Sequence, residues 1–234
     1  MPLTGLLNAF ELQLCAKAAK RSLTLERAFF VSVLATMLNA LPLPGGSLLR
    51  GAVLHKLGVR LSTISYILFA AAGVWLLLAL AITLYLLLDG YFSVVSAGLC
   101  CVVVLFIGSR IAKASSVKVA IAFCVLRVLL LLFFATRLFI VFMAISEHSQ
   151  FTDALFLSLS GVLGSAISIV PAGLGVTEGI GAYLAKINGS NPAEAFVALG
   201  IDRVFGYVGS IVLVGLIWLF RKQNIRSIRK PFNL

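Results

Sequence analysis

The sequence of residues 61–88 reads LSTISYILFAAAGVWLLLALAITLYLLL and contains no Asp, Glu, Lys or Arg. A helix of about 20 apolar residues spans the roughly 30 Å hydrocarbon layer of a bilayer, so this stretch predicts a membrane-spanning helix. Three further stretches share its character and predict three more spans, at residues 92–108, 117–145 and 193–220. The sequence therefore predicts an all-α integral membrane protein with about four full spans.

The overall composition agrees with this class. Of the 234 residues, 61% are hydrophobic and 12% are charged, whereas a soluble domain has about 45–50% apolar and about 25% charged residues. We therefore expect residues 1–234 to form a single polytopic membrane domain. The net charge of +11 does not indicate a nucleic-acid partner, because the Lys and Arg residues lie in short loops and in the C-terminal tail.

These basic residues also predict an orientation. Cytoplasmic loops of membrane proteins are enriched in Lys and Arg, whereas the segment 147–150 between the third span and the next apolar stretch has neither. The sequence thus predicts three spans in residues 61–145 and a basic cytoplasmic tail at 221–234. The basic residues that border the middle spans are Arg50, Lys56, Arg60, Arg110, Lys113 and Lys118.

Two other apolar stretches end in clusters of proline and glycine. If the charge pattern sets the sides, segments 23–60 and 151–192 must each return to the side that they left. We therefore predict two re-entrant hairpins, while ordinary interhelical turns are the alternative. Irregular backbone at membrane depth must be shielded by protein or line a wet cavity. The predicted breaks contain Pro44, Gly45 and Gly46 in the first hairpin and Pro171, Gly173 and Gly175 in the second.

The two hairpins also resemble each other in sequence. Residues 51–57 and 181–187 share the pattern G-A-x-L-x-K-[LI], and the three spans between them place the copies in opposite orientations. Secondary transporters use inverted repeats with broken helices to build a site near the bilayer midplane. An inverted repeat and a chance match between apolar helices both explain the pattern.

The first 22 residues predict an amphipathic N-terminal helix. Glu11 interrupts their apolar stretch and no basic region precedes it, so this segment is not typical of a signal peptide.

Several charged residues fall in or beside apolar segments, where they are costly and commonly mark functional sites. They are Arg50, Arg127, Arg137, Glu178, Asp202 and Arg203. Arg127 and Arg137 lie about 80° apart around a helix, so both can face one cavity. One interpretation is simple pairing, in which Asp202 neutralises one arginine while Arg137 snorkels outward. The other is that Arg50, Arg127, Arg137 and Arg203 bind an anionic lipid head group.

The glycine breaks favour an anion as well. A helix that starts after a break directs free N–H groups and a positive dipole end towards the break, and a phosphate is the natural occupant. Glu178 and Asp202 are predicted to cap or gate this site. His55 and His148 lie on opposite predicted sides, so we expect no metal site, no cofactor and no catalytic group, and hence no enzyme.

The break segments resemble those of a known family. Residues 41–50 read LPLPGGSLLR and residues 171–179 read PAGLGVTEG, with Asn188-Gly189, Ala193-Glu194-Ala195 and Arg203 downstream. These segments are similar to the motifs L-P-x-x-x-G-[ED]-x-x-R and P-x-G-x-G-x-x-E-G of the transmembrane region of lysylphosphatidylglycerol synthases. Ser47 stands where that family often has an acidic residue.

The resemblance extends over about residues 6–220, and family members usually have one or two further spans before this region. It implies a flippase-like protein that moves an anionic or aminoacylated phospholipid, or a polyprenyl-phosphate-linked glycan, between leaflets. It also implies that the soluble aminoacyl-transferring domain is absent. Membrane lipids are then the expected partners, and a bacterial or archaeal cytoplasmic membrane is the expected location. The alternatives are a non-transporting subunit that assists a cell-envelope lipid or glycan synthesis enzyme, and a carrier of small solutes or ions.

Overall fold

The computed structural model describes residues 2–39, 45–88, 90–146, 150–166 and 174–223. Within these ranges all regular secondary structure is helical, which confirms the predicted all-α class. The helices are α1 (Pro2–Ala18), α2 (Leu25–Leu38), α3 (Gly45–Lys56), α4 (Leu61–Leu87), α5 (Gly90–Ala114), α6 (Val117–Ile145), α7 (Phe151–Ala166), α8 (Val176–Ile187) and α9 (Pro192–Gln223).

Four of these helices are long and apolar enough to cross a membrane. Their qualifying segments are Leu61–Leu87, Gly90–Lys113, Val117–Ile145 and Pro192–Ile217, so the four predicted spans are confirmed. Helix α5 extends beyond the predicted span 92–108 and includes Arg110 and Lys113. It continues there because residues 109–114 contain no Pro or Gly. A helix can continue beyond the hydrocarbon layer once its side chains become basic.

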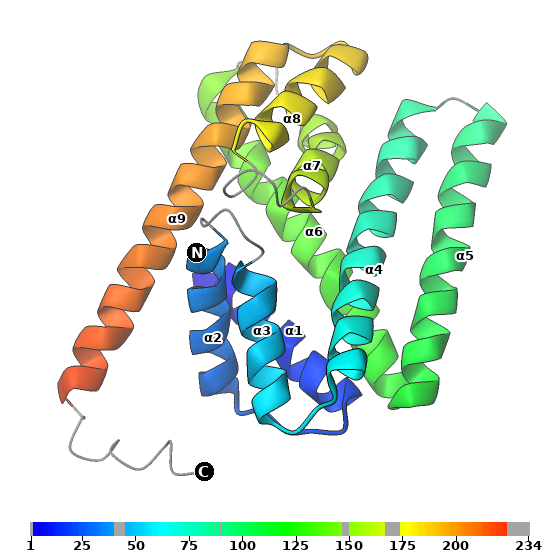
Figure 1. Cartoon of the computed structure of the whole chain (residues 1–234). Helices are drawn as coiled ribbons and strands as arrows, with labels where there is room; N and C mark the ends of the chain where they lie inside the picture. The colour runs from blue at the N-terminus through cyan, green and yellow to red at the C-terminus, as the bar shows by residue number, and fades with distance from the viewer. Residues whose placement is uncertain (1, 40–44, 89, 147–149, 167–173, 224–234) are drawn as a thin grey trace.

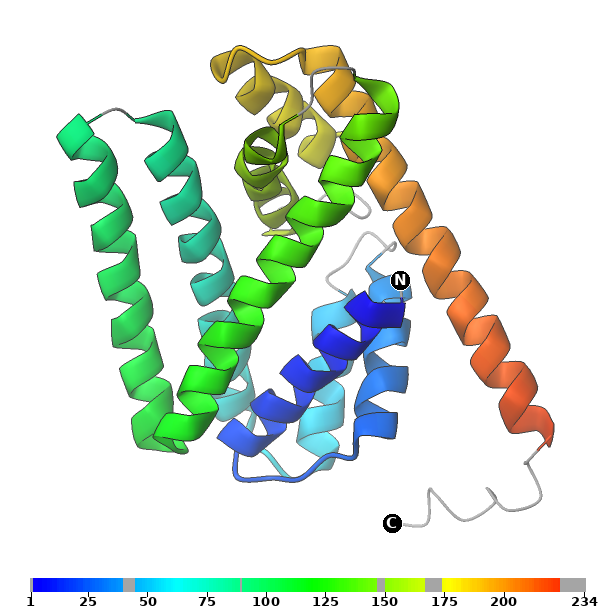
Figure 2. The same ribbon diagram turned by 180° about the vertical axis from the view of Figure 1, so that it is seen from behind.

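The remaining helices of the two predicted hairpins are short. Helices α2, α3, α7 and α8 contain 14, 12, 16 and 12 residues, fewer than the roughly 20 that a full span needs. Figures 1 and 2 show α2 and α3 side by side at one end of the molecule and α7 and α8 at the other. The end of α2 and the start of α3 lie towards the middle of the molecule, as do the end of α7 and the start of α8 (Figure 1).

Small residues allow the helices of each pair to approach closely. A Cβ atom on Gly45 would lie 2.6 Å from the carbonyl oxygen of Leu38, and one on Gly164 would lie 2.8 Å from the Cβ of Thr177. The Gly46 N–H donates to Asn39 Oδ1 at 2.9 Å. Gly45 and Gly46 of the first predicted break therefore serve helix packing. Pro44, Pro171 and Gly173, also predicted break residues, lie outside the described residues.

The buried apolar side chains form two clusters, one around each pair of short helices. The first contains Leu12 of α1 and Leu54 of α3, whereas the second contains Phe156 of α7 and Leu199 of α9. Helices α4 and α6 run through both clusters. In α6, Arg127 lies in sequence between Phe123 of the first cluster and Leu131 of the second.

Helix α1 extends over Pro2–Ala18, within the predicted 1–22, and packs against α2 and α6. Its buried face contains the small residues Gly5, Ala9 and Ala16 together with Leu12. The same face carries Glu11.

Candidate functional site: buried ion pairs between distant helices

Glu11 is buried in the protein interior and contacts two arginines from other helices. Its Oε1 atom lies 2.6 Å from Nη2 of Arg127 on α6 and 3.6 Å from Nη1 of Arg50 on α3. The first contact is a short charge-assisted hydrogen bond. The second is too long for a hydrogen bond. These three residues, which we call the Glu11 group, join α1, α3 and α6.

Aromatic side chains surround the Arg127 guanidinium. Its Cζ atom lies 5.6 Å from the ring centroid of Trp75 and 5.5 Å from that of Phe123. Cation–π contacts at these distances are favourable, and more so where water is excluded. Arg127 is therefore held between a carboxylate and two rings.

A second pair joins α6 to α9. Nε and Nη2 of Arg137 donate to Oδ1 and Oδ2 of Asp202 at 2.9 and 2.6 Å. This bidentate geometry is the strongest arrangement of an arginine with a carboxylate. The predicted pairing of Asp202 with an arginine is therefore correct, but the outward snorkelling of Arg137 in that interpretation is wrong, because Nε and Nη2 of its guanidinium bind Asp202.

A third pair joins α8 to α9 at the start of α8. Glu178 Oε1 lies 3.0 Å from Nη1 of Arg203, and Oε2 of the same carboxylate accepts the N–H of Gly175 at 2.8 Å. Gly175 precedes the helix with φ of 78°, a left-handed conformation that glycine adopts without strain. Glu178 thus caps α8, as the sequence predicted, and also neutralises Arg203.

The ion pairs leave an excess of positive charge. Within the described residues, the ion pairs of Arg50, Arg127, Arg137 and Arg203 involve three carboxylates, because Glu11 serves two of these arginines. Arg50, which shares Glu11 with Arg127, is only partly buried, and a cation without a counter-ion of its own is unfavourable at such a site of low dielectric constant. The excess of one charge therefore favours binding of an anion.

The structure groups the predicted arginines only in part. Arg50 and Arg127 share Glu11, whereas Arg137 and Arg203 each have their own carboxylate. Head-group binding by these four residues stays a prediction.

Sequence reasoning missed Glu11 as a site residue. The one signal for it was an acidic residue within an otherwise apolar N-terminal stretch. Its partner Arg127 is 116 positions away, so no local pattern identifies the pair.

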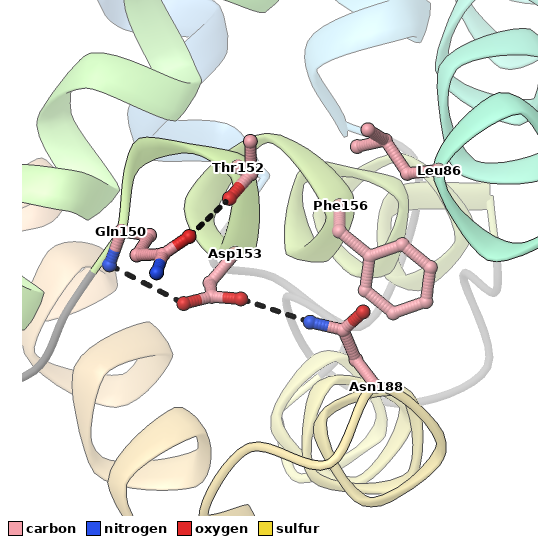
Figure 3. Close-up of a pocket in the computed structure, with 6 residues that line it drawn as sticks. All are labelled: Leu86, Gln150, Thr152, Asp153, Phe156 and Asn188. Atoms are coloured by element: carbon pink, nitrogen blue, oxygen red, sulfur yellow. Dashed lines mark hydrogen bonds between the residues drawn. The ribbon is translucent and has the colours of Figure 1, made fainter.

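A polar pocket of about 370 Å³ was also not predicted. It lies where α4, α7 and α8 meet, and Asp153 lines it between Gln150 and Asn188 (Figure 3). The Asp153 carboxylate accepts the backbone N–H of Gln150 at 3.3 Å and the side-chain amide of Asn188 at 2.8 Å. Asp153 thus caps α7 and ties it to the end of α8. The pocket is lined by Leu86, Gln150, Thr152, Asp153, Phe156 and Asn188.

The family model described as the lysylphosphatidylglycerol synthase TM region matches residues 1–215. Comparison with curated proteins and with solved structures found no match.

Proposed function

The chain belongs to the family of lysylphosphatidylglycerol synthase transmembrane regions, and from this premise we propose that it moves a lipid with an anionic head group between the two leaflets. The family and the four apolar helices fit an integral membrane protein of lipid metabolism or transport. Leaflet exchange is the specific role that we propose within this class. The cargo would be an anionic or aminoacylated phospholipid or a polyprenyl-phosphate-linked glycan, and we propose no enzymatic activity.

The excess positive charge of the buried ion pairs carries this proposal. A lipid head group must cross the hydrocarbon layer without losing all of its polar partners, since an unsolvated charge there is very costly. Arginines inside the protein supply such partners to a phosphate, because a guanidinium matches the geometry of phosphate oxygens. The neighbouring carboxylates compensate three of the four arginine charges when no lipid is bound.

The two pairs of short helices support the same function. We propose that α2–α3 and α7–α8 are re-entrant hairpins that enter from opposite faces and meet near the midplane. Helices α3 and α8 both begin in the middle of the molecule and run towards opposite ends (Figure 1). Their N-terminal dipole ends would then add to the positive potential that Arg50 and Arg203 provide.

Leaflet exchange in reconstituted vesicles tests the proposal. The purified protein is inserted into vesicles that contain fluorescent phosphatidylglycerol, and a membrane-impermeant quencher reports the fraction in the outer leaflet over time. We expect fast exchange with the wild-type chain and exchange at least about tenfold slower for Arg203→Ala and Glu178→Ala. A lost hydrogen bond to a charged group costs about 1.5–3 kcal/mol, and each 1.4 kcal/mol is about tenfold in rate.

Arg110→Ala is the matched control, because Arg110 is an exposed arginine near the end of α5. It should exchange lipid at the wild-type rate. Folding of each variant is checked by its thermal unfolding in detergent. If the folded wild-type protein moves no lipid and instead co-purifies with a cell-envelope synthesis enzyme, the proposed transport is wrong and the chain is a subunit of that enzyme.

A further inference from the structure

The two arginines of the Glu11 group are held very differently. The Arg127 side chain is only 7% exposed, and its contact with Glu11 is 2.6 Å long. The Arg50 side chain is 21% exposed, and its contact with the same oxygen is 3.6 Å long. Arg127 therefore neutralises Glu11, and Arg50 is the cation in excess.

The same region contains donors that lack an acceptor. Within the part of the chain that the structure describes, Nε of Arg50, Nε of Arg127 and Nε1 of Trp75 are buried and make no hydrogen bond. Burying a donor without a partner costs about 1–3 kcal/mol, and native proteins satisfy the great majority of such groups. Arg127 contacts both the Trp75 ring and Glu11, so these donors belong to one neighbourhood.

We propose that Arg50, Arg127 and Trp75 form a phosphate subsite, and that Glu11 is the counter-ion that the phosphate displaces from Arg50. This inference rests on the proposed function, because the phosphate is that of the lipid head group. A tetrahedral oxyanion supplies several acceptors in different directions, which suits donors from α3, α4 and α6. It also cancels the one excess positive charge.

Displacement follows from the electrostatics of the group. A phosphate near Glu11 is repelled by its carboxylate, so the two anions compete for Arg50. The long contact between Arg50 and Glu11 is the weaker of the two, and Arg50 is the more exposed arginine. Arg127 stays with Glu11 and keeps its charge compensated while Arg50 turns to the ligand.

Competition makes a prediction that a merely structural ion pair does not. Replacing Glu11 by the neutral and nearly isosteric glutamine removes the competitor, so Glu11→Gln should bind the phosphate-bearing lipid more tightly. We expect the concentration for half-saturation to fall by at least about fivefold, the lower end of typical coupling between sites. Arg50→Gln should raise it by a similar factor while the pair of Glu11 and Arg127 remains.

Tryptophan emission reports this binding without any transport. The chain has two tryptophans, Trp75 and Trp218, so a Trp218→Phe background leaves only the indole of the proposed subsite. The protein in an uncharged detergent is titrated with dioctanoyl phosphatidylglycerol, with dioctanoylglycerol, which lacks the phosphate, and with inorganic phosphate. Over the same range of concentrations, we expect the phospholipid to change the emission saturably and the other two compounds to leave it unchanged.

Asp153→Asn is the matched control, because it removes one acidic charge from the polar pocket and leaves the Glu11 group intact. Its half-saturation should equal that of the background protein. Unchanged or weaker binding by folded Glu11→Gln overturns the proposal, as does an equal response to dioctanoylglycerol. Equal saturation by inorganic phosphate overturns the assignment to a lipid.

The two proposals can fail separately. If Glu11→Gln tightens binding but vesicles show no leaflet exchange, the subsite is supported and the proposed transport function is wrong. If vesicles exchange lipid and Glu11→Gln binds no more tightly, transport is supported and the proposed displacement of Glu11 from Arg50 is wrong.

Discussion

Arginines inside a membrane protein need counter-charges, and here these come from distant parts of the chain. Arg127 and Glu11 are 116 positions apart, and Arg137 and Asp202 are 65 apart. Each pair therefore links helices that are far apart along the chain. Such links favour one arrangement of apolar helices over others that bury the same area, because lipid solvates apolar surface as well as protein does.

The pair of Arg137 and Asp202 should stabilise the fold. Asp202→Asn leaves a largely buried guanidinium with a neutral partner, and breaking a buried pair from one side typically costs about 3–5 kcal/mol. We expect a lower unfolding temperature in detergent for Asp202→Asn and for Arg137→Gln. The double variant should lose much less than the sum of the two, since neither charge is then left alone.

Lys113→Gln is the control for loss of a cation, because Lys113 is exposed at the end of α5. It should unfold at nearly the wild-type temperature. Additive losses in the double variant would show that the two side chains do not depend on each other.

At the same scale, the sequence locates charges but not their partners. Charged residues are costly in apolar spans, and this identified Arg127, Arg137, Asp202 and Arg203 as candidate site residues. Helical periodicity places them on a face, yet the partner depends on how helices pack, which no local pattern encodes. Glu11 lies on a helix too short to register as a span, and its role therefore emerged only from the structure.

At the scale of elements, long helices are the most predictable and their contacts the least. Hydrophobic length alone identified α4, α5, α6 and α9, because the thickness of the bilayer imposes it. The contacts of α7 with α8 depend instead on side-chain shape. Gly164 faces Thr177 so closely that a Cβ atom there would lie 3.0 Å from the Thr177 Cα.

Gly164→Ala should therefore destabilise the pair α7–α8. The added methyl group has no space and must push the two helices apart, and overpacking of this kind costs about 1–3 kcal/mol. We expect a lower unfolding temperature in detergent. Gly98→Ala is the control, because a Cβ on Gly98 meets no atom within 4 Å, and alanine there raises helix propensity. Equal unfolding temperatures for the two variants would contradict close packing at Gly164.

The equivalent residues of the proposed inverted repeat lie in similar surroundings. Leu54 of α3 and Leu184 of α8 are both buried, with 0% and 9% exposure. A Cβ atom added to Gly51 would contact Ile64 of the next helix. One added to Gly181 would meet Leu199 of the next helix. The inverted repeat itself stays a prediction.

At the scale of the whole molecule, basic residues gather at one end. The start of α4, the end of α5 and the start of α6 lie at the same end in Figure 1, and these termini carry Arg60, Lys113 and Lys118. The positive-inside rule predicts that such an end faces the cytoplasm. We propose that the turn between α8 and α9 then faces the opposite side. The basic tail from residue 224 onward lies outside the described residues, and its side of the membrane stays a prediction.

Cysteine labelling in intact cells tests this orientation together with the second re-entrant hairpin. Ser190→Cys, in a background without the four native cysteines, places one thiol in the turn before α9. A membrane-impermeant maleimide should label it from outside, because α7 and α8 return to the side that they left. Lys113→Cys is the matched position at the basic end, and it should react only after the membrane is opened. If Ser190→Cys instead reacts only from the cytoplasm, α7 and α8 do not form a hairpin open to the outside, and the proposed approach of two hairpins from opposite faces is wrong.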